Sequence, residues 1–273
     1  EQLTHDPEEL EAGLQPLFAA HGGPILCAVH GEEAFGDFAG PAPERLALLA
    51  AAARAGATAV DVDARFASST SSVDVPRILS THAAGPVAES LEAAYGRALG
   101  HARACDLVKV VPACATAEEG IAVLRWLEHR RPERAVVFGS GAAAVFTRLL
   151  APRFGSSLVY VRPSAAVEAA VAASGHELRV CAAPGQPPAD EVRAVWAAAR
   201  DHDALDVAAV LGRPIEHSAS PAIHGAACAE LGLDGVLVPV APAGLEQALD
   251  LPHLRGASVT APFKSDAARA AAR

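Results

Sequence analysis

The chain has 273 residues, of which 51% are hydrophobic, and its formal net charge at pH 7 is -10. At roughly 150 residues per domain this length predicts one large domain or two unequal ones. The negative charge, with arginines scattered rather than clustered, argues against binding to nucleic acid or to an anionic membrane surface. The 5 cysteines are widely spaced and form no CxxC pair, so they indicate neither a disulfide framework nor a zinc site. Without a signal peptide or a membrane-length apolar run, we expect a cytoplasmic protein with reduced thiols.

Short β-branched runs alternate with segments of helical period, which is the pattern of a parallel α/β sheet or barrel. In chain order, the sequence predicts strands over residues 25–29, 59–63, 77–80, 107–111, 135–138 and 158–161. Helices are predicted over residues 43–55, 86–99, 115–130, 142–150 and 189–200. A second βα unit opens with a predicted strand over residues 207–211, so we expect two domains, residues 1–204 and 205–273.

Only two of the 22 lysines and arginines are lysines, Lys109 and Lys264. A lysine amine can form a Schiff base or carry a proton, whereas a guanidinium does neither, so both positions are candidates for chemistry. The alternative is that both are ordinary surface lysines.

Three candidate groups lie at or near the ends of consecutive predicted strands, where a parallel barrel gathers its catalytic residues. Asp63 ends one strand, His82 follows the next, and Lys109 lies within the third. An amine and an imidazole suit imine chemistry on a ketone, because the iminium acidifies the neighbouring C–H bond and the histidine removes its proton. Taken singly, His82 is open to a capping or core role, and Asp63 fits a helix N-cap better than catalysis.

Four segments in order resemble type I 3-dehydroquinate dehydratase: ILSTH at 78–82, DLVKV at 106–110, RLLAPRFGS at 148–156 and APGQP at 183–187. The resemblance implies a TIM barrel that needs no metal or diffusible cofactor. Lys109 would form the Schiff base with 3-dehydroquinate, and His82 would be the general base and later the acid. Arg148 would hold the substrate carboxylate, and Gln186 would belong to a lid loop. Asp63 stands where the family usually has glutamate.

The chain also departs from this family. His30 stands where the family carries an arginine, the serine of the lid loop is Ala182, and an extra stretch covers residues 164–175. The family's first strand is absent from the sequence. A second reading is therefore a degenerate barrel that serves only as a scaffold or binding module for the domain that follows; the retained His82 and Lys109 oppose that reading.

The second domain carries LGRPIEHSASP at 211–221 and GASVTAPFK at 256–264, which together resemble the substrate domain of shikimate dehydrogenase. Ser218, Ser220 and Thr260 offer hydroxyl groups to a small anion, and Lys264 offers a proton carrier. The resemblance implies that the serines bind the shikimate carboxylate and that Lys264 acts in hydride transfer. Without that resemblance, the segment reads as a turn with serine caps and a surface lysine.

The order of the two resemblances is that of bifunctional enzymes of the shikimate pathway of aromatic amino acid biosynthesis. We therefore expect an N-terminally incomplete (β/α)8 TIM-type barrel followed by a partial α/β shikimate dehydrogenase substrate-binding domain. The expected ligands are small molecules: 3-dehydroquinate, 3-dehydroshikimate and shikimate. The dehydrogenase would need NADP, with its binding domain beyond Arg273; the absence of methionine also suggests a piece of a longer product.

A competing signal is the stretch AVVFGSGAAA at 135–144, which reads as strand, glycine turn and helix. With Arg162 at the end of the next predicted strand, it suggests a dinucleotide-binding turn. A single glycine motif is weak evidence, and this one precedes the substrate domain, so we keep it as an alternative.

Overall fold

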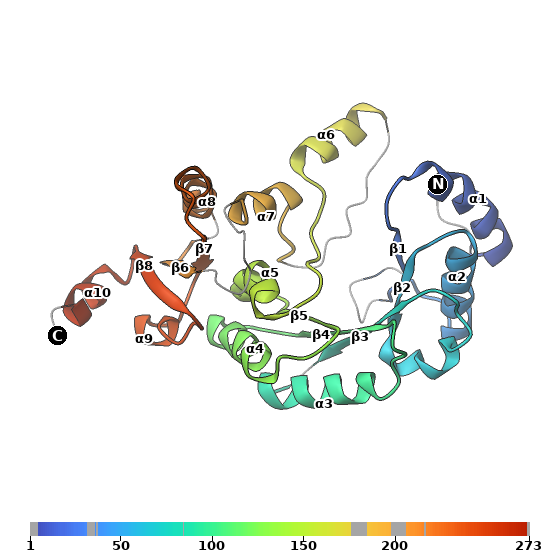
Figure 1. Ribbon diagram of the computed structural model, residues 1–273, viewed down its shortest axis with the longest axis horizontal. Coiled ribbons are helices and arrows are strands. Elements are labelled where there is room, and N and C mark those ends of the chain that lie inside the picture. The colour runs from blue at the N-terminus through green and yellow to red at the C-terminus, as the bar shows by residue number, and fades with distance from the viewer. Residues whose placement is uncertain are drawn as a thin grey trace. The chain divides into compact units, whose positions relative to one another are not determined.

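The computed structural model describes residues 5–31, 36, 38–83, 85–175, 185–197, 206–215 and 217–271 (Figure 1). The chain divides into two compact units. The first comprises Glu1–Ala83 and Glu92–Val111, and the second comprises Ala84–Leu91 and Pro112–Arg273. None of the described helices is long and apolar enough to cross a membrane.

The first unit is built on neighbouring strands in the order β1-β2-β3-β4, and the pairs β1–β2 and β2–β3 are parallel. These strands are β1 (Leu26–Ala28), β2 (Ala59–Asp63), β3 (Arg77–Ala83) and β4 (Leu107–Pro112). Val60 and Val62 are fully buried, as is typical of parallel strands that are covered on both faces.

Two packed helices accompany this sheet, α1 (Pro7–Ala20) and α2 (Ala42–Arg54). The Asp6 side chain caps α1 by accepting a hydrogen bond from the Glu8 amide at 2.8 Å, and α2 buries Leu48 and Leu49. Between β2 and β3 the chain forms two short 3-10 helices, η2 (Ala64–Phe66) and η3 (Ser68–Thr70). The helix α3 (Val87–Leu99) precedes β4.

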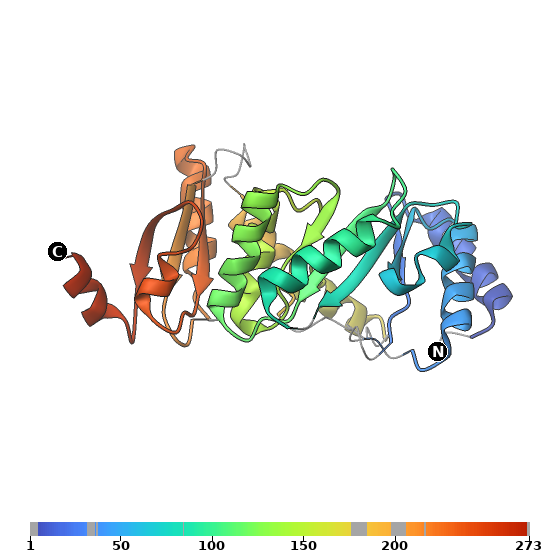
Figure 2. The same ribbon diagram turned by 90° about the horizontal axis from the view of Figure 1, so that it is seen from below.

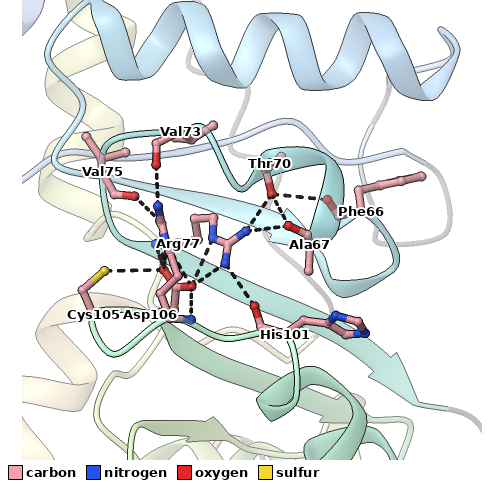
Figure 3. A network of polar contacts seen from close by, with 10 residues as sticks. Phe66, Ala67, Thr70, Val73, Val75, Arg77, His101, Cys105 and Asp106 are labelled. Carbon is pink, nitrogen blue, oxygen red and sulfur yellow. Dashed lines mark hydrogen bonds and ion pairs between the residues drawn. The ribbon is translucent and has the colours of Figure 1, made fainter.

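A buried ionic network joins the segments around the amino ends of β3 and β4 (Figure 3). Arg77, the first residue of β3, donates to the Asp106 carboxylate from Nη2 at 2.6 Å and from its backbone amide at 2.9 Å. The same guanidinium donates to the Ala67 carbonyl at 2.6 Å, and the Arg103 guanidinium binds Asp106 at 3.0 Å. Arg77 and Asp106 are almost completely buried, so their pairing is needed to offset the desolvation cost of the two charges.

The second unit contains the helix α4, which begins with a capping box between Thr116 and Glu119. Its first part comprises α4 (Ala117–Arg130), β5 (Ala135–Val137), η4 (Ala142–Ala144), α5 (Val145–Leu150), η5 (Ala151–Phe154), α6 (Ala165–Ala173) and α7 (Ala189–Val195). A three-stranded parallel sheet of order β7-β6-β8 follows, which Figure 2 shows in orange and red. Its elements are β6 (Asp206–Leu211), α8 (Ser220–Leu231), β7 (Gly235–Val240), α9 (Leu245–Ala248), β8 (Leu254–Val259) and α10 (Lys264–Ala271).

The parallel α/β fold class is confirmed, and most predicted elements occur close to their predicted bounds. The predicted strand at 158–161 is wrong. A strand needs a neighbouring backbone to bond. Residues 158–161 form no bridge to another described residue, and a bridge occurs only at the next position, between Arg162 and Pro188. The predicted helix 142–150 is split into η4 and α5, and α7 ends at Val195, although residues 198–200 of its predicted span lie outside the described residues. The extra stretch at 164–175 contains α6.

Candidate active site

A buried ion pair occupies the centre of the first unit. Lys109, in β4, is 4% exposed, and its Nζ donates a hydrogen bond to Oδ2 of Asp61 at 2.8 Å. Asp61 lies in the middle of β2, and the hydroxyl of Ser80, in β3, donates to its other oxygen. Three neighbouring strands thus each contribute one polar group to the same buried point.

Two imidazoles lie beside this pair. His82 follows Ser80 by two residues on β3, so both side chains face the same side of the sheet. The ring of His30, just after β1, meets the His82 ring edge-on with 6.3 Å between centroids, and His30 Nε2 lies 3.8 Å from Asp61 Oδ2. A carboxylate, an amine and two imidazoles are therefore collected at one place.

Burial and neighbouring charges set the protonation of these groups. Desolvation, helped by the positive charge of Lys109, lowers the pKa of His82 to about 4, so its imidazole is neutral at pH 7 and able to accept a proton. Burial alone would raise the pKa of Asp61, but Lys109 and His30 with the hydrogen bonds from Lys109 and Ser80 outweigh it and hold that pKa below its usual range. The cluster therefore contains an ionised carboxylate beside a neutral base.

Asp63, the acid named from the sequence, is engaged differently. It caps η2 by accepting from the Arg65 amide at 2.9 Å, and its carboxylate binds the Arg65 guanidinium at 2.6 Å. Asp61 was not predicted from the sequence, where its only signal is an acid between two valines in the middle of the strand that Asp63 ends.

A cavity of about 500 Å³ opens beside His82, within the size range of about 300–1,000 Å³ that is usual for small-molecule sites. The residues that line it include two arginines and two histidines. The lining residues are Asp63, Ala64, Arg65, Thr81, His82, Arg97, Ala98 and His101.

Arg148 and Gln186 belong to the second unit. Arg148, in α5, is 2% exposed and its guanidinium lies 4.1 Å from the centre of the Phe138 ring. Its Nε has no hydrogen-bond partner, no carboxylate among the described residues pairs with it, and desolvation lowers its pKa to about 10. A buried cation without a counter-charge is costly, so this position is suited to an anionic ligand. Gln186 lies half-buried in the turn before α7, and Ala182 lies outside the described residues.

The four residues named in the second domain lie after two neighbouring strands. Leu211 of β6 pairs with Val259 of β8, and the Thr260 amide donates to the Leu211 carbonyl at 2.8 Å, so the carboxyl ends of these strands are adjacent. The Ser218 hydroxyl accepts from the Ser220 amide at 3.3 Å at the start of α8. Lys264 is exposed at the start of α10, and among the described residues it makes no bond to either serine.

The glycine turn at 139–141 does not fit a nucleotide phosphate. A Cβ atom on Gly139 would come within 2.7 Å of the Cys114 sulfur, and one on Gly141 within 2.5 Å of the Cys114 carbonyl oxygen. The glycines are therefore required by packing against the protein itself, which leaves no cradle for NADP there.

Comparisons with known proteins identify both parts of the chain. The family model for type I 3-dehydroquinase matches residues 2–203, and that for the shikimate dehydrogenase substrate binding domain matches residues 210–273. Shikimate dehydrogenase (NADP(+)) of Natronomonas pharaonis is 45% identical over 67 residues, which are 23% of this chain and 25% of that protein. The Trichormus variabilis enzyme of the same name is 50% identical over 60 residues, or 20% of this chain and 21% of that one. The chain therefore spans about a quarter of these curated relatives.

Two solved structures have similar folds. The 3-dehydroquinate dehydratase of Geobacillus kaustophilus gives a TM-score of 0.55 at 25% identity, covering 69% of this chain and 72% of that one. The dehydroquinate dehydratase and shikimate dehydrogenase of S. pombe gives 0.54 at 18% identity, covering 97% of this chain and 49% of that one. The resemblance found in the sequence is confirmed: the chain belongs to the type I 3-dehydroquinase family, and its residues 210–273 match the substrate-binding domain of shikimate dehydrogenases.

Proposed function

We propose that the chain is part of a bifunctional shikimate-pathway enzyme that dehydrates 3-dehydroquinate to 3-dehydroshikimate and then binds this product for NADP-dependent reduction to shikimate. The observation that carries the dehydratase half is the buried Lys109–Asp61 pair beside a neutral His82. An amine, its counter-ion and a base are the groups that an imine-forming lyase needs.

In the proposed reaction, Lys109 Nζ condenses with the substrate ketone and water leaves. The resulting iminium draws electrons from the adjacent C–H bond, and neutral His82 takes that proton. The protonated His82 then returns it to the departing hydroxyl, and hydrolysis of the iminium releases the product. Asp61 holds the lysine and balances the positive charge of the iminium, which forms where the ammonium was.

Arg148 and Gln186 are proposed as substrate-binding residues of this half. The support for Arg148 is its buried guanidinium, which has an unpartnered Nε and thus one hydrogen-bond donor left for a ligand carboxylate. Gln186 follows Gly185, whose left-handed backbone at φ 76° allows the turn that precedes α7. Asp63, which lines the cavity beside His82, is proposed to act on substrate only through that cavity.

The dehydratase half is tested by incubating the protein with 3-dehydroquinate and borohydride, followed by intact-mass measurement and peptide mapping. We expect one reduced adduct, located on Lys109, and none in Lys109→Arg, which keeps the charge but cannot form an imine. Circular dichroism shows whether that variant is folded. A folded wild-type protein without an adduct would instead favour a barrel that has become a scaffold.

For the second half, Ser218, Ser220 and Thr260 are proposed to bind the substrate carboxylate, with Lys264 as proton carrier in the redox step. The support is the adjacency of the β6 and β8 carboxyl ends. NADP would supply the hydride, and we assign no residue of this chain to it. Titration calorimetry with shikimate should show binding that Ser218→Ala weakens and that Ser157→Ala, a serine of the dehydratase-like part, leaves unchanged.

A further inference from the structure

Among the titratable groups of the cluster, His30 is the one to which the proposed reaction gives no task. Its backbone is fixed by the bond from the Phe38 amide to the His30 carbonyl, at 3.1 Å. Its side chain is 22% exposed, so it lies between the buried carboxylate and solvent. Its Nε2 is 3.8 Å from the same oxygen of Asp61 that binds Lys109.

Imine formation needs several proton transfers, and a single histidine would have to carry out these transfers as well as the later removal of a proton from carbon. As the ammonium of Lys109 becomes an iminium, its nitrogen loses two protons and the ketone oxygen gains two before it leaves as water. His82 must be neutral at the next step, because it then takes the proton from carbon. A second proton carrier on the lysine side of the cluster lets His82 stay neutral throughout.

The surroundings of His30 fit that second task. Asp61 cannot store a proton well, because Lys109 and the other neighbours hold its pKa below the usual range. A carboxylate with a lowered pKa passes a proton from Lys109 to a neighbouring acceptor. The adjacent acceptor is the His30 ring, which is partly exposed to solvent. The charged or titratable groups that face His30 are Asp61, Lys109, Arg45, Asp63 and His82.

We propose that His30 is the proton carrier for formation and hydrolysis of the Lys109 imine, while His82 serves the substrate carbon. The first Nζ proton passes through Asp61 to His30, which frees the lone pair of the amine. That pair forms the N–C bond as the carbonyl π pair moves to oxygen. The second proton moves from nitrogen to oxygen in forming the carbinolamine. His30 then protonates that hydroxyl, the C–O bond breaks, and water leaves the iminium. No oxidant or metal is needed, and hydrolysis reverses the same steps.

This inference rests on the proposed Schiff-base function, and rapid-quench borohydride trapping separates the two. His30→Gln keeps a polar side chain of similar size that cannot titrate. We expect its adduct on Lys109 to form about 100-fold more slowly than in the wild-type protein, within the range of about 10²–10⁴ for general acid–base catalysis. Exchange of the substrate α-hydrogen with deuterated water, measured once the imine has formed, should be unchanged.

His82→Gln is the matched control, for which we expect the reverse: rapid trapping and no hydrogen exchange. Added imidazole should restore fast trapping to His30→Gly, which a merely structural role would not allow. In the wild-type protein, the acidic limb of the trapping rate should coincide with the NMR titration of His30, a readout that needs no variant. If His30→Gln traps the imine at the wild-type rate and with the wild-type pH profile, the role of His30 alone is overturned. If the wild-type protein gives no trapping, the Schiff-base function is overturned as well.

Discussion

Two aspartates on one strand give the sharpest test of the site. Asp61 and Asp63 both lie on β2 and face the same side, yet their environments differ. The side chains of Asp61 and Lys109 are 0% and 5% exposed, whereas the Asp63 and Arg65 side chains are 19% and 64% exposed. Replacing each aspartate by asparagine removes one charge at nearly constant volume.

The expected losses of unfolding free energy differ by several kcal/mol. Asp61→Asn leaves the Lys109 ammonium buried without a counter-charge, which typically costs about 3–5 kcal/mol. Asp63→Asn weakens an exposed pair, which is worth about 0–1 kcal/mol. With a urea m-value of about 2 kcal/mol/M, the midpoint should fall by about 1.5–2.5 M in the first case and by less than about 0.5 M in the second.

The assay must report on the first unit. Both tryptophans, Trp126 and Trp196, lie in the second unit, so their fluorescence is unsuitable. Hydrogen exchange of peptides from β2, β3 and β4, followed across a urea series, reads the correct region. Equal midpoint shifts in the two variants, or a larger one in Asp63→Asn, would refute the assignment of Asp61 as the partner of the buried lysine. Borohydride trapping on the same samples should show slower imine formation only in Asp61→Asn.

Three further predictions address other groups. Asp106→Asn should lower the unfolding free energy measured by the same exchange assay by about 3–5 kcal/mol, because it leaves the 1% exposed Arg77 guanidinium without its counter-charge. Arg148→Met should leave stability equal or higher but raise the KM for 3-dehydroquinate about tenfold to a hundredfold, since charge-assisted hydrogen bonds are worth about 1.5–3 kcal/mol; an unchanged KM would exclude a carboxylate contact. The single-turnover rate of C–H removal should stay level as pH falls from 7 and drop only near pH 4, because protonated His82 cannot accept a proton; a drop near pH 6.5 would contradict the shifted pKa.

The positions of His82 and Lys109 could be predicted because they depend on local patterns. Apolar runs define β3 and β4, and side chains near the carboxyl ends of parallel strands gather at one edge. Whether Asp61 or Asp63 meets the lysine could not be predicted in this way. Both face the same side, and the choice depends on the register between β2 and β4, which β3 separates.

The other differences from the sequence predictions have separate causes. The 158–161 segment has the composition of a strand, but composition does not supply a neighbouring backbone. The helix α1 was missed although its signals are local: Asp6 as cap, Pro7 in the first turn, and Glu8 and Glu9 beside the positive helix end. The glycine turn at 139–141 shows the reverse error, because close packing on Cys114 produces the same glycine spacing as a phosphate site.

The groups that stabilise β3 and β4 lie at the amino ends of these strands, whereas the proposed reactive groups lie farther along them. At the amino ends, Arg77 and Asp106 form a buried pair that also includes the Arg77 backbone amide, and this fixes the longitudinal position of one strand against the segment that starts the other. Farther along the same strands lie His82 and Lys109, whose relative position depends on that register. A slip of one residue in either strand would turn that strand's side chain to the opposite face, so that His82 and Lys109 would no longer lie on the same side. The network in Figure 3 is therefore a condition for the site, although it contains none of the side chains of Asp61, Lys109, His30 and His82.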